Sequence, residues 1–314
     1  MSVADELLAS ACAELDAWDR RDAGCTPRDP RDVTVVAGPT LVAVGFSACV
    51  LKTRDGHCIR VARSAEAARR HEREAAVLDV VADQVDVEVP WPSRTLPASE
   101  RWLYGAVVRP WLDGSHLTDA ADPAPVAALL EQLQAINPAA LDGLVEPFDR
   151  WCERQLSTAT AGIAAISGLV EPILCDWLED IVELLGRELA ELTSPSVVHG
   201  DLWHENMLAP RRRLSGVLDW EDAGIGDPAV DLAGLWYLGD AWVQQVVGVL
   251  DAPERFLRRV AYWRVARELR GAAWSGRHDD ASELAESAAK VGSLAAVFHG
   301  SLDVKPRGPG MHRT

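Results

Sequence analysis

The feature that most constrains the fold is a change in hydrophobic periodicity about a third of the way along the 314-residue chain. Before Gly114, apolar and β-branched residues gather in short runs, which predict strands at 33–36, 41–44, 49–53, 58–62 and 103–111. One helix is expected among them, at 65–81. Beyond Gly114 the apolar residues recur at helical spacing, which predicts helices at 125–136, 148–166, 172–192, 231–250 and 253–274. Strand signals persist there only at 197–198 and 214–218, so we expect an α+β fold with a small antiparallel sheet followed by a larger, mostly helical part.

The charge balance limits the partners. The chain carries 48 acidic and 31 basic side chains, a net charge of −17 at pH 7. This surplus repels phosphate backbones and anionic lipids, so it argues against nucleic acid or a membrane as the main partner. It favours a cationic small molecule only weakly, because net charge does not locate a site. Nothing in the sequence indicates an oligomeric state.

The cysteines and the chain ends indicate a compartment. The six cysteines show no paired short spacing, which is typical of buried thiols in a reducing environment. The first residues form no signal peptide pattern, and no apolar run approaches the length that spans a bilayer. We therefore expect a cytoplasmic protein, with an amphipathic helix within 1–32 and a flexible tail at 305–314.

One short stretch carries most of the chemical information. His199 to Asn206 reads His-Gly-Asp-Leu-Trp-His-Glu-Asn, and Asp219 follows at the end of an apolar run. Phosphoryl transfer from a nucleotide needs one carboxylate to orient the attacking hydroxyl and two oxygen ligands that hold Mg²⁺ on the phosphates. Asp201, Asn206 and Asp219 can fill these three roles, so the spacing predicts a magnesium-dependent phosphotransferase.

Other interpretations of these residues exist. An isolated Asp followed by Asn is more often a turn or a helix cap. A zinc site built from His199, Asp201 and His204 is conceivable on ligand type, and it would indicate a hydrolase. It leaves Asn206 and Asp219 unexplained, and His199 is better interpreted as a structural residue that braces the loop.

The motifs at 197–208, 216–221 and 226–233 resemble those of the aminoglycoside phosphotransferase and choline kinase-like family, and the resemblance extends in element order over about 33–274. It implies a bilobal, protein kinase-like fold with ATP as the phosphate donor. It further implies that Asp201 is the catalytic base and that Asn206 and Asp219 hold Mg²⁺. Asp227 and Asp231 would organise the segment after the metal-binding strand.

The resemblance also places the nucleotide-binding residues. Ser47 lies in the loop that would cover the phosphates, although that loop has one glycine rather than several. Arg60 takes the place of the usual kinase lysine, with Glu74 as its favoured partner and Glu72 as the alternative. The Pro110 carbonyl and the Leu112 amide would bind adenine.

The domain organisation follows from the same resemblance. The segment 1–32 would pack on a nucleotide-binding N-lobe at 33–112, and 113–304 would form the helical C-lobe with the catalytic loop and the acceptor site. Candidate acceptor-binding residues are His204, Glu205, Glu221 and Asp222. The expected function is ATP-dependent transfer of phosphate to a hydroxyl of an amine-bearing antibiotic, as in aminoglycoside resistance kinases. A metabolic kinase for an amino sugar, a fructosamine or a choline-like acceptor is one alternative, and a catalytically silent nucleotide-binding protein is another.

Overall fold

The computed structural model describes residues 40–44, 47–53, 56–92, 94–99 and 103–298. These residues form two compact units, which we describe separately. The sheet unit comprises the described residues up to Leu117 together with Glu205–Ala223, and the helical unit comprises Thr118–His204 and the described residues from Gly224 onward. The predicted helix within 1–32, the predicted strand at 33–36 and the predicted tail at 305–314 lie outside the described residues.

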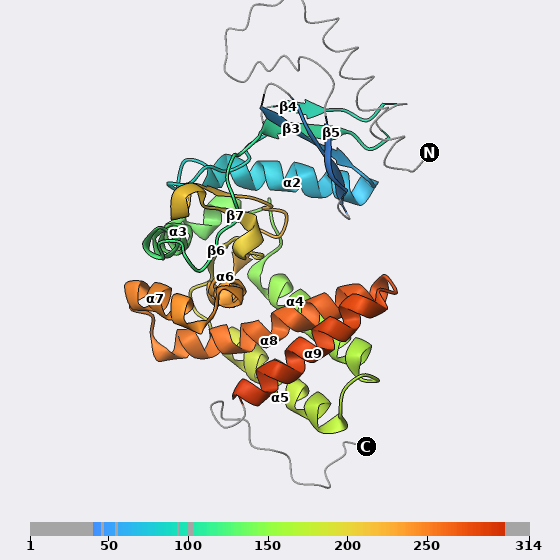
Figure 1. Ribbon diagram of the computed structural model, residues 1–314, viewed down its shortest axis with the longest axis vertical. Coiled ribbons are helices and arrows are strands. Elements are labelled where there is room, and N and C mark those ends of the chain that lie inside the picture. Colours follow the sequence, from blue (N-terminus) through green and yellow to red (C-terminus); the bar gives the residue numbers. More distant parts are fainter. Residues whose placement is uncertain (1–39, 45–46, 54–55, 93, 100–102, 299–314) are drawn as a thin grey trace, which may run out of the picture. The chain divides into compact units, whose positions relative to one another are not determined.

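The sheet unit is built on one antiparallel sheet and one long helix (Figure 1). The strands follow the spatial order β1-β2-β3-β5-β4, and α2 follows β3 in the chain. The bounds are β1 (Thr40–Val44), β2 (Ala48–Lys52), β3 (His57–Ala62), α2 (Ala65–Val81), β4 (Arg94–Leu96) and β5 (Ala106–Pro110). Ser64 caps α2, because its side chain accepts a hydrogen bond from the Ala67 amide at 3.0 Å. The predictions for 41–44, 49–53, 58–62 and 65–81 are confirmed.

The core of this sheet lies on one face and explains the alternation of the strands. Its members are buried apolar side chains from the three central strands: Cys49, Leu51, Ile59, Val61, Ala106 and Val108. The register places Arg60 opposite both Val50 and Val107, so its side chain leaves the sheet on the face opposite to this core. The strand pairing therefore directs the Arg60 side chain of β3 away from the apolar core of the sheet.

The segment Glu205–Ala223 joins the sheet unit through backbone hydrogen bonds. The strands β7 (Met207–Leu208) and β8 (Gly216–Val217) pair with each other. The Val217 amide donates to the Glu88 carbonyl at 2.9 Å, and the Glu88 amide donates to the Ser215 carbonyl at 2.8 Å. Residues 205–223 therefore belong to the sheet unit by their contacts, whereas we predicted that they belong to the helical C-lobe at 113–304. The division into functional domains stays a prediction.

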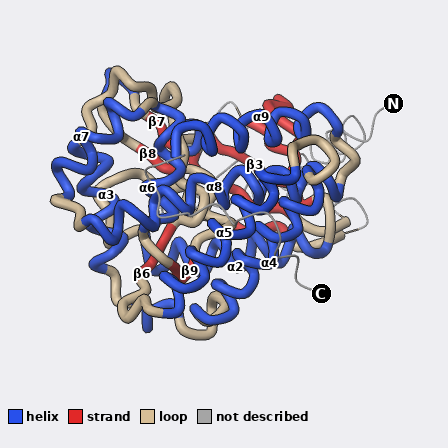
Figure 2. Tube along the Cα trace, turned by 90° about the horizontal axis from the view of Figure 1, so that it is seen from below, coloured by secondary structure: helices blue, strands red, loops and turns tan. Residues whose placement is uncertain are grey.

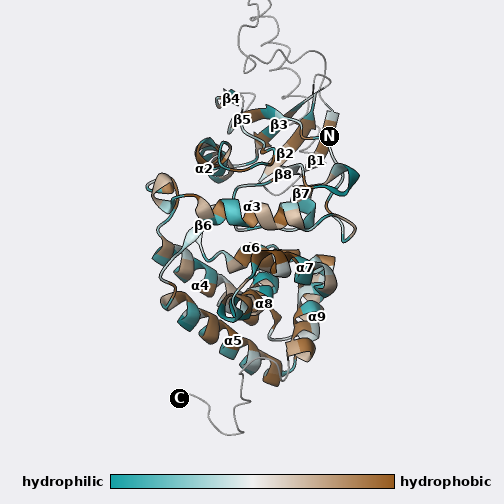
Figure 3. Ribbon diagram, turned by 90° about the vertical axis from the view of Figure 1, so that its left-hand side faces the viewer, coloured by the Kyte–Doolittle hydropathy of each residue, from teal (hydrophilic) through white to brown (hydrophobic). Residues whose placement is uncertain are grey.

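The helical unit consists mainly of helices, which dominate the tube in Figure 2. They are α3 (Ala124–Ala135), α4 (Phe148–Ile166), α5 (Pro172–Ala190), α6 (Ala229–Gly234), α7 (Asp240–Leu250), α8 (Glu254–Arg277) and α9 (Ala281–Phe298). A two-stranded sheet of β6 (Ser196–Val198) and β9 (Gly224–Gly226) lies in the same unit. α8 packs against α4, α5, α6 and α9, so it is the central helix of this unit. The ribbons of α4 and α5 show both brown and teal residues, as expected for helices with one buried face (Figure 3).

Two predictions for the helical unit need correction. The single helix expected at 231–250 is divided into α6, a short 3₁₀ helix η4 (Leu235–Leu238) and α7. Gly239 causes the break, because its φ of 91° lies in a region that only glycine adopts without strain. The helix α9 was not predicted, since its alanine-rich sequence blurs the apolar period. Within the described ranges, no helix has the length and apolar character needed to cross a bilayer.

Candidate functional site

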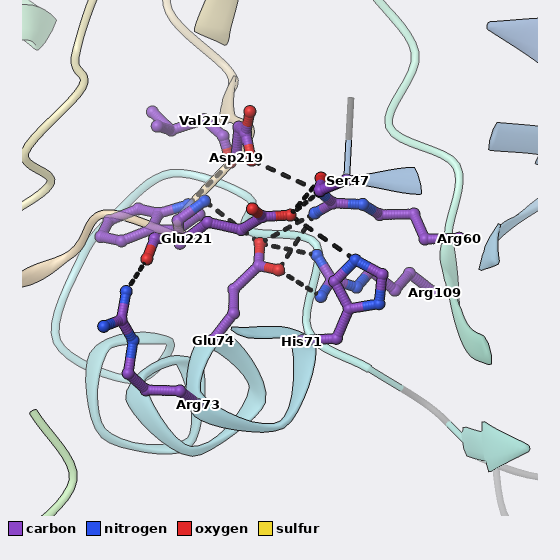
Figure 4. Close-up of polar contacts among 10 residues, drawn as sticks. Ser47, Arg60, His71, Arg73, Glu74, Arg109, Val217, Asp219 and Glu221 are labelled. Atoms are coloured by element: carbon purple, nitrogen blue, oxygen red, sulfur yellow. Dashed lines mark hydrogen bonds and ion pairs between the residues drawn. The ribbon is translucent and has the colours of Figure 1, made fainter. Parts of the chain in front are cut away.

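A buried carboxylate on α2 organises the polar cluster of the sheet unit (Figure 4). Arg109 donates two hydrogen bonds to Glu74, at 2.8 and 2.6 Å. Arg60 donates to the same carboxylate at 3.2 and 3.0 Å, and the Trp220 amide donates at 3.1 Å. Burial alone would raise the pKa of Glu74, but the charges of Arg60 and Arg109 outweigh burial and lower it. Glu74 is therefore ionised and holds two guanidinium groups in place.

Arg60 links this cluster to the segment after β8. Its second terminal nitrogen donates to Glu221 and lies 3.5 Å from a carboxylate oxygen of Asp219. Glu221 also accepts from the Ser47 hydroxyl at 3.1 Å. The structure thus brings together Ser47, Arg60, Glu74, Asp219 and Glu221, which come from distant parts of the sequence.

The surroundings of Glu221 stabilise its charged form. Burial would raise the pKa of this carboxyl, but hydrogen bonding to His71, the charge of Arg60 and the Ser47 hydroxyl lower it to about 2. The Arg73 guanidinium donates to the backbone carbonyl of Glu221, which fixes the chain at this residue. Glu221 therefore contacts the expected phosphate-binding side chains, and a role toward the acceptor stays a prediction.

The structure confirms one expected pair and adds a partner that sequence reasoning missed. Arg60 pairs with Glu74, whereas Glu72 is exposed on the other side of α2. Arg109 was expected only as part of the strand predicted at 103–111. A charged residue inside the apolar run Val107-Val108-Arg109 was the available signal, because a buried charge requires a partner.

The two candidate metal ligands lie on neighbouring backbone. The Leu218 amide donates to the Asn206 carbonyl at 2.7 Å, which brings the residue before Asp219 alongside Asn206. Asp219 has a φ of 59°, a left-handed conformation that Asp tolerates better than most residues, and its side chain is 49% exposed. Carboxylate and amide oxygens are hard donors that suit Mg²⁺, which takes its remaining ligands from water and phosphate. The donor set fits this ion.

The expected adenine-binding segment continues from β5. Pro110 is the last residue of this strand and faces His57 across the sheet. The Trp111 amide donates to the Gly56 carbonyl at 2.9 Å, and Lys52 lies 4.1 Å from the centre of the Trp111 ring. The amide bond fixes the backbone at Trp111, and Leu112 is the next residue of the chain.

Asp201, the expected base, belongs to the helical unit and is held there by two arginines of α8. Arg267 donates to one of its carboxylate oxygens at 2.8 Å, and Arg270 donates to the same oxygen. Arg270 also donates to the Gly200 carbonyl at 3.2 Å. Burial would raise the pKa of Asp201, but the charges of Arg270 and Arg267 outweigh burial and lower it. Asp201 is thus a fixed carboxylate that is ionised at neutral pH.

The backbone around Asp201 is fixed by α6. The Asp231 carboxylate accepts hydrogen bonds from the His199 and Gly200 amides, both at 2.8 Å. A Cβ added to Gly234 would lie 2.0 Å from the Leu202 carbonyl oxygen, so only glycine permits this close approach. The buried His199 accepts from the Asp201 amide at 3.3 Å, which confirms its bracing role.

Asp227 anchors the start of the same helix. It accepts from Arg259 at 2.9 and 3.2 Å and from the Trp263 ring nitrogen at 2.8 Å. Since Asp227 and Arg259 are both buried, this pair fixes α6 against α8. Asp227 therefore fixes the start of α6, and Asp231 on this helix holds the backbone of residues 199–200.

The remaining candidates are more dispersed. His204 and Glu205 begin a 3₁₀ helix, η2 (His204–Asn206), in which Glu205 is exposed. The His204 ring lies 5.1 Å from that of Trp203 and 6.2 Å from that of Tyr237, whereas Asp222 is half-buried in the sheet unit. Across the described residues, no three His, Cys, Asp or Glu side chains converge as metal ligands. The zinc interpretation of His199, Asp201 and His204 therefore lacks its ligand geometry.

Comparisons with known proteins agree with this arrangement. The profile of a phosphotransferase enzyme family matches residues 40–269. Viomycin phosphotransferase of Streptomyces vinaceus is 34% identical over 170 residues, which cover 42% of this chain and 58% of that enzyme. The chain thus matches somewhat less than two thirds of the length of this relative.

Solved structures share the fold at low sequence identity. The GDP complex of wild-type aminoglycoside 2'-phosphotransferase-IIIa superposes with a TM-score of 0.72 at 18% identity, covering 85% of this chain and 94% of that one. A macrolide 2'-phosphotransferase from Brachybacterium faecium superposes with a TM-score of 0.63 at 21% identity, covering 88% and 98%. These likenesses show the expected bilobal, kinase-like fold.

Proposed function

Because this chain belongs to the phosphotransferase enzyme family, we propose that it transfers the γ-phosphate of ATP to a hydroxyl of an amine-bearing antibiotic. The observation that carries the proposal is the arrangement of Arg60, which a buried Glu74 holds within 3.5 Å of Asp219. A fixed cation beside an exposed carboxylate suits a phosphate chain together with its metal ion. The cytoplasm, where ATP is available, is the proposed location.

Each candidate residue has a proposed role in nucleotide binding. Arg60 binds the phosphates with its planar guanidinium, and Glu74 orients it. Ser47 donates its hydroxyl to a phosphate oxygen, for which it exchanges its present partner Glu221. The Pro110 carbonyl and the Leu112 amide bind the adenine edge.

The metal would be held by Asn206 and Asp219. Mg²⁺ bound there supplies charge neutralisation on the transferred phosphate. Asp219 lies next to Arg60, so one cluster supplies both the cation and the metal ligand to the phosphates. Asn206 adds a neutral oxygen, which limits the negative charge close to the nucleotide.

Asp201 is the proposed base. An ionised carboxylate accepts a hydrogen bond from the attacking hydroxyl and orients its oxygen toward phosphorus. Arg267 and Arg270 hold this carboxylate in one position, and Asp231 fixes the backbone that carries it. Positioning of this kind supplies much of the rate enhancement in phosphoryl transfer.

An antibiotic acceptor is supported by the likeness of the chain to a viomycin phosphotransferase, an aminoglycoside phosphotransferase and a macrolide phosphotransferase. His204, Glu205, Glu221 and Asp222 stay candidates for contact with the acceptor. A metabolic kinase of the same family is the alternative, and it predicts turnover with an amino sugar, a fructosamine or choline. A silent nucleotide-binding protein predicts ATP binding without transfer.

The test is acceptor-dependent release of ADP from ATP and Mg²⁺. We expect turnover with at least one antibiotic from a panel of viomycin, kanamycin and erythromycin, and phosphate on the recovered antibiotic by mass spectrometry. Asp201→Asn should lower kcat by about 10²- to 10⁴-fold while ATP still binds. Turnover with choline or amino sugars alone would contradict the antibiotic assignment, and ATP binding without any transfer would support the silent alternative.

A further inference from the structure

Arg109 is a buried cation in the sheet unit to which the proposed function assigns no role. It lies in β5 and is 1% exposed. The ladder between β3 and β5 pairs Arg109 with Cys58 and Val107 with Arg60, so both arginines leave the sheet on the same face. On that face both of them donate hydrogen bonds to Glu74 of α2.

The stability of the sheet does not explain this second arginine. A buried ion pair adds little to stability compared with apolar side chains of similar volume. The Nε atom of Arg109 is also buried and has no hydrogen-bond partner among the described residues, which costs further free energy. A methionine would fill the position without either cost, so a guanidinium at this place needs a reason other than packing.

Glu74 divides its hydrogen bonds unequally between the two arginines (Figure 4). Arg109 uses two nitrogens, one for each carboxylate oxygen, at 2.8 and 2.6 Å. The Trp220 amide donates to one of these oxygens at 3.1 Å. Arg60 uses a single nitrogen, which is shared between both oxygens at 3.2 and 3.0 Å. Because a carboxylate offers about four lone-pair positions, Arg109 and the Trp220 amide occupy most of them, and Arg60 has the weaker hold.

The charges of Arg60, Glu74 and Arg109 follow the same division. Arg109 alone neutralises the buried Glu74, so one positive charge is left over in this trio. The Arg60 side chain is 13% exposed, whereas the other two are almost completely buried, so the surplus charge lies on Arg60. The second terminal nitrogen of Arg60 contacts Glu221 and lies 3.5 Å from Asp219. The surplus charge therefore faces the residues beside which we propose that the phosphates bind.

We propose that Arg109 is a positioning residue for nucleotide binding, because it compensates the buried Glu74 and so allows Arg60 to turn its guanidinium toward the phosphates. This inference rests on the proposed function, since it requires that Arg60 binds phosphate. Without Arg109, the trio would be a single ion pair, and a move of Arg60 to the nucleotide would leave a buried carboxylate uncompensated. Arg60 would then stay at Glu74, and phosphates would bind more weakly.

Calorimetry with ATP and with adenosine tests the proposal, because adenosine has no phosphate that Arg60 could bind. Arg109→Met should weaken the binding of ATP about tenfold, which corresponds to about 1.4 kcal/mol, and that of adenosine less than about twofold. Arg69→Met removes an exposed cation from α2 and is the matched control, with both affinities as in the wild type. Equal losses for ATP and adenosine in Arg109→Met would indicate general damage to the sheet. That result, or an unchanged ATP affinity, would overturn the proposal.

Arg109→Lys gives a second measurement, which does not depend on whether Arg109→Met folds. The lysine keeps a positive charge beside Glu74, so this variant should bind ATP within about threefold of the wild type. A loss of about tenfold or more in Arg109→Lys, with adenosine binding unchanged, would show that the charge is not what matters and would overturn the proposal.

A double variant tests whether Arg109 acts through Glu74. In Arg109→Met combined with Glu74→Gln, no buried carboxylate is left to hold Arg60. ATP should therefore bind about threefold or more tightly than it does to Arg109→Met alone, a gain that a merely structural role of Arg109 would not produce. An ATP affinity equal to or below that of Arg109→Met would overturn the proposal.

Arg60→Met separates this inference from the proposed function. The proposed function requires that Arg60→Met loses ATP affinity relative to adenosine, and an unchanged ATP affinity would contradict the phosphate contact itself. A loss in Arg60→Met without any loss in Arg109→Met would instead contradict this inference alone and leave the proposed function intact.

Discussion

Glu74 accepts hydrogen bonds from Arg109 and Arg60 at the same time, although Glu74 and Arg109 are almost completely withdrawn from solvent. A buried ion pair gains little over an apolar core, but removal of one partner leaves an uncompensated charge. Glu74→Ala should therefore lower the free energy of unfolding by about 3–5 kcal/mol in urea titrations. Glu72→Ala, on the exposed face of the same helix, is the matched control and should change it by less than about 0.5 kcal/mol. Equal losses in the two variants would show that substitution on α2 itself, and not the loss of the ion pair, was responsible.

Asp231 should control the loop that carries Asp201. Its carboxylate binds the His199 and Gly200 amides, so Asp231→Ala leaves two buried donors without an acceptor. We expect a loss of about 2–4 kcal/mol and faster hydrogen exchange at these two amides. Asp240→Ala, an exposed acid at the start of α7, should leave their exchange unchanged. Slow exchange retained in Asp231→Ala would mean that α6 does not hold the loop.

The pH dependence of activity should report the arginines beside Asp201. Since Arg270 and Arg267 lower the pKa of this carboxyl, the wild type keeps an ionised base to lower pH than an isolated Asp would. Arg270→Gln removes one of these charges, so the acidic limb of kcat/KM should move to higher pH. Arg277→Gln, exposed in the last turn of α8, is the control. An acidic limb at the same pH in Arg270→Gln would exclude the arginine as the cause.

Glu221 should contribute a pH-dependent part of the stability. Its pKa falls from an ordinary 4.5 to about 2 in the folded protein, so its stabilisation is complete above about pH 4.5 and is lost as the pH falls toward 2. The difference in free energy of unfolding between wild type and Glu221→Gln should therefore be constant from pH 7 to 5 and shrink below pH 4.5. Urea titrations at stepped pH measure it. A difference that grows on acidification would contradict the assigned contacts.

Asp219 should set the magnesium requirement. Asp219→Asn keeps a residue that tolerates the left-handed backbone at φ 59°, so the fold should persist, but it removes one negative ligand. The Mg²⁺ concentration for half-maximal ADP release should rise about tenfold or more, in line with the loss of a charged oxygen donor. Asp83→Asn, which changes an exposed acid of the same unit just after α2, serves as the control. An unchanged Mg²⁺ requirement would remove Asp219 from the metal site.

Local patterns predicted the sheet, whereas the Arg60 pair was predicted from the family resemblance together with the apolar face of the following helix. Strand alternation places Arg60 on one face, and the helical spacing of α2 places Glu74 on its inner side. β4 was missed because three residues between prolines carry no pattern that distinguishes a strand from a loop. The break at Gly239 was missed because an isolated glycine within an apolar run does not reveal its φ.

The contacts of Asp201 could not be predicted for a different reason. The helix around Arg267 and Arg270 was expected, but α8 carries further arginines, at 255, 258, 259, 264 and 277. Which of them meets the loop depends on the rotation of α8 in its packing against α4 and α6. The local signal for this contact was that Arg267 and Arg270 lie three residues apart, on either side of the buried Leu269.

The contact between Gly234 and the Leu202 carbonyl has a consequence for how such a protein can change. Because Asp231 and Gly234 fix the path of residues 199–202 from the backbone side, the backbone of Asp201 is held separately from its carboxylate, which Arg267 and Arg270 hold from α8. A substitution at either arginine can then change the orientation of the carboxylate without displacing the backbone that carries it. A bulkier side chain at position 234 would instead displace the backbone itself, so the loop tolerates change on α8 better than on α6.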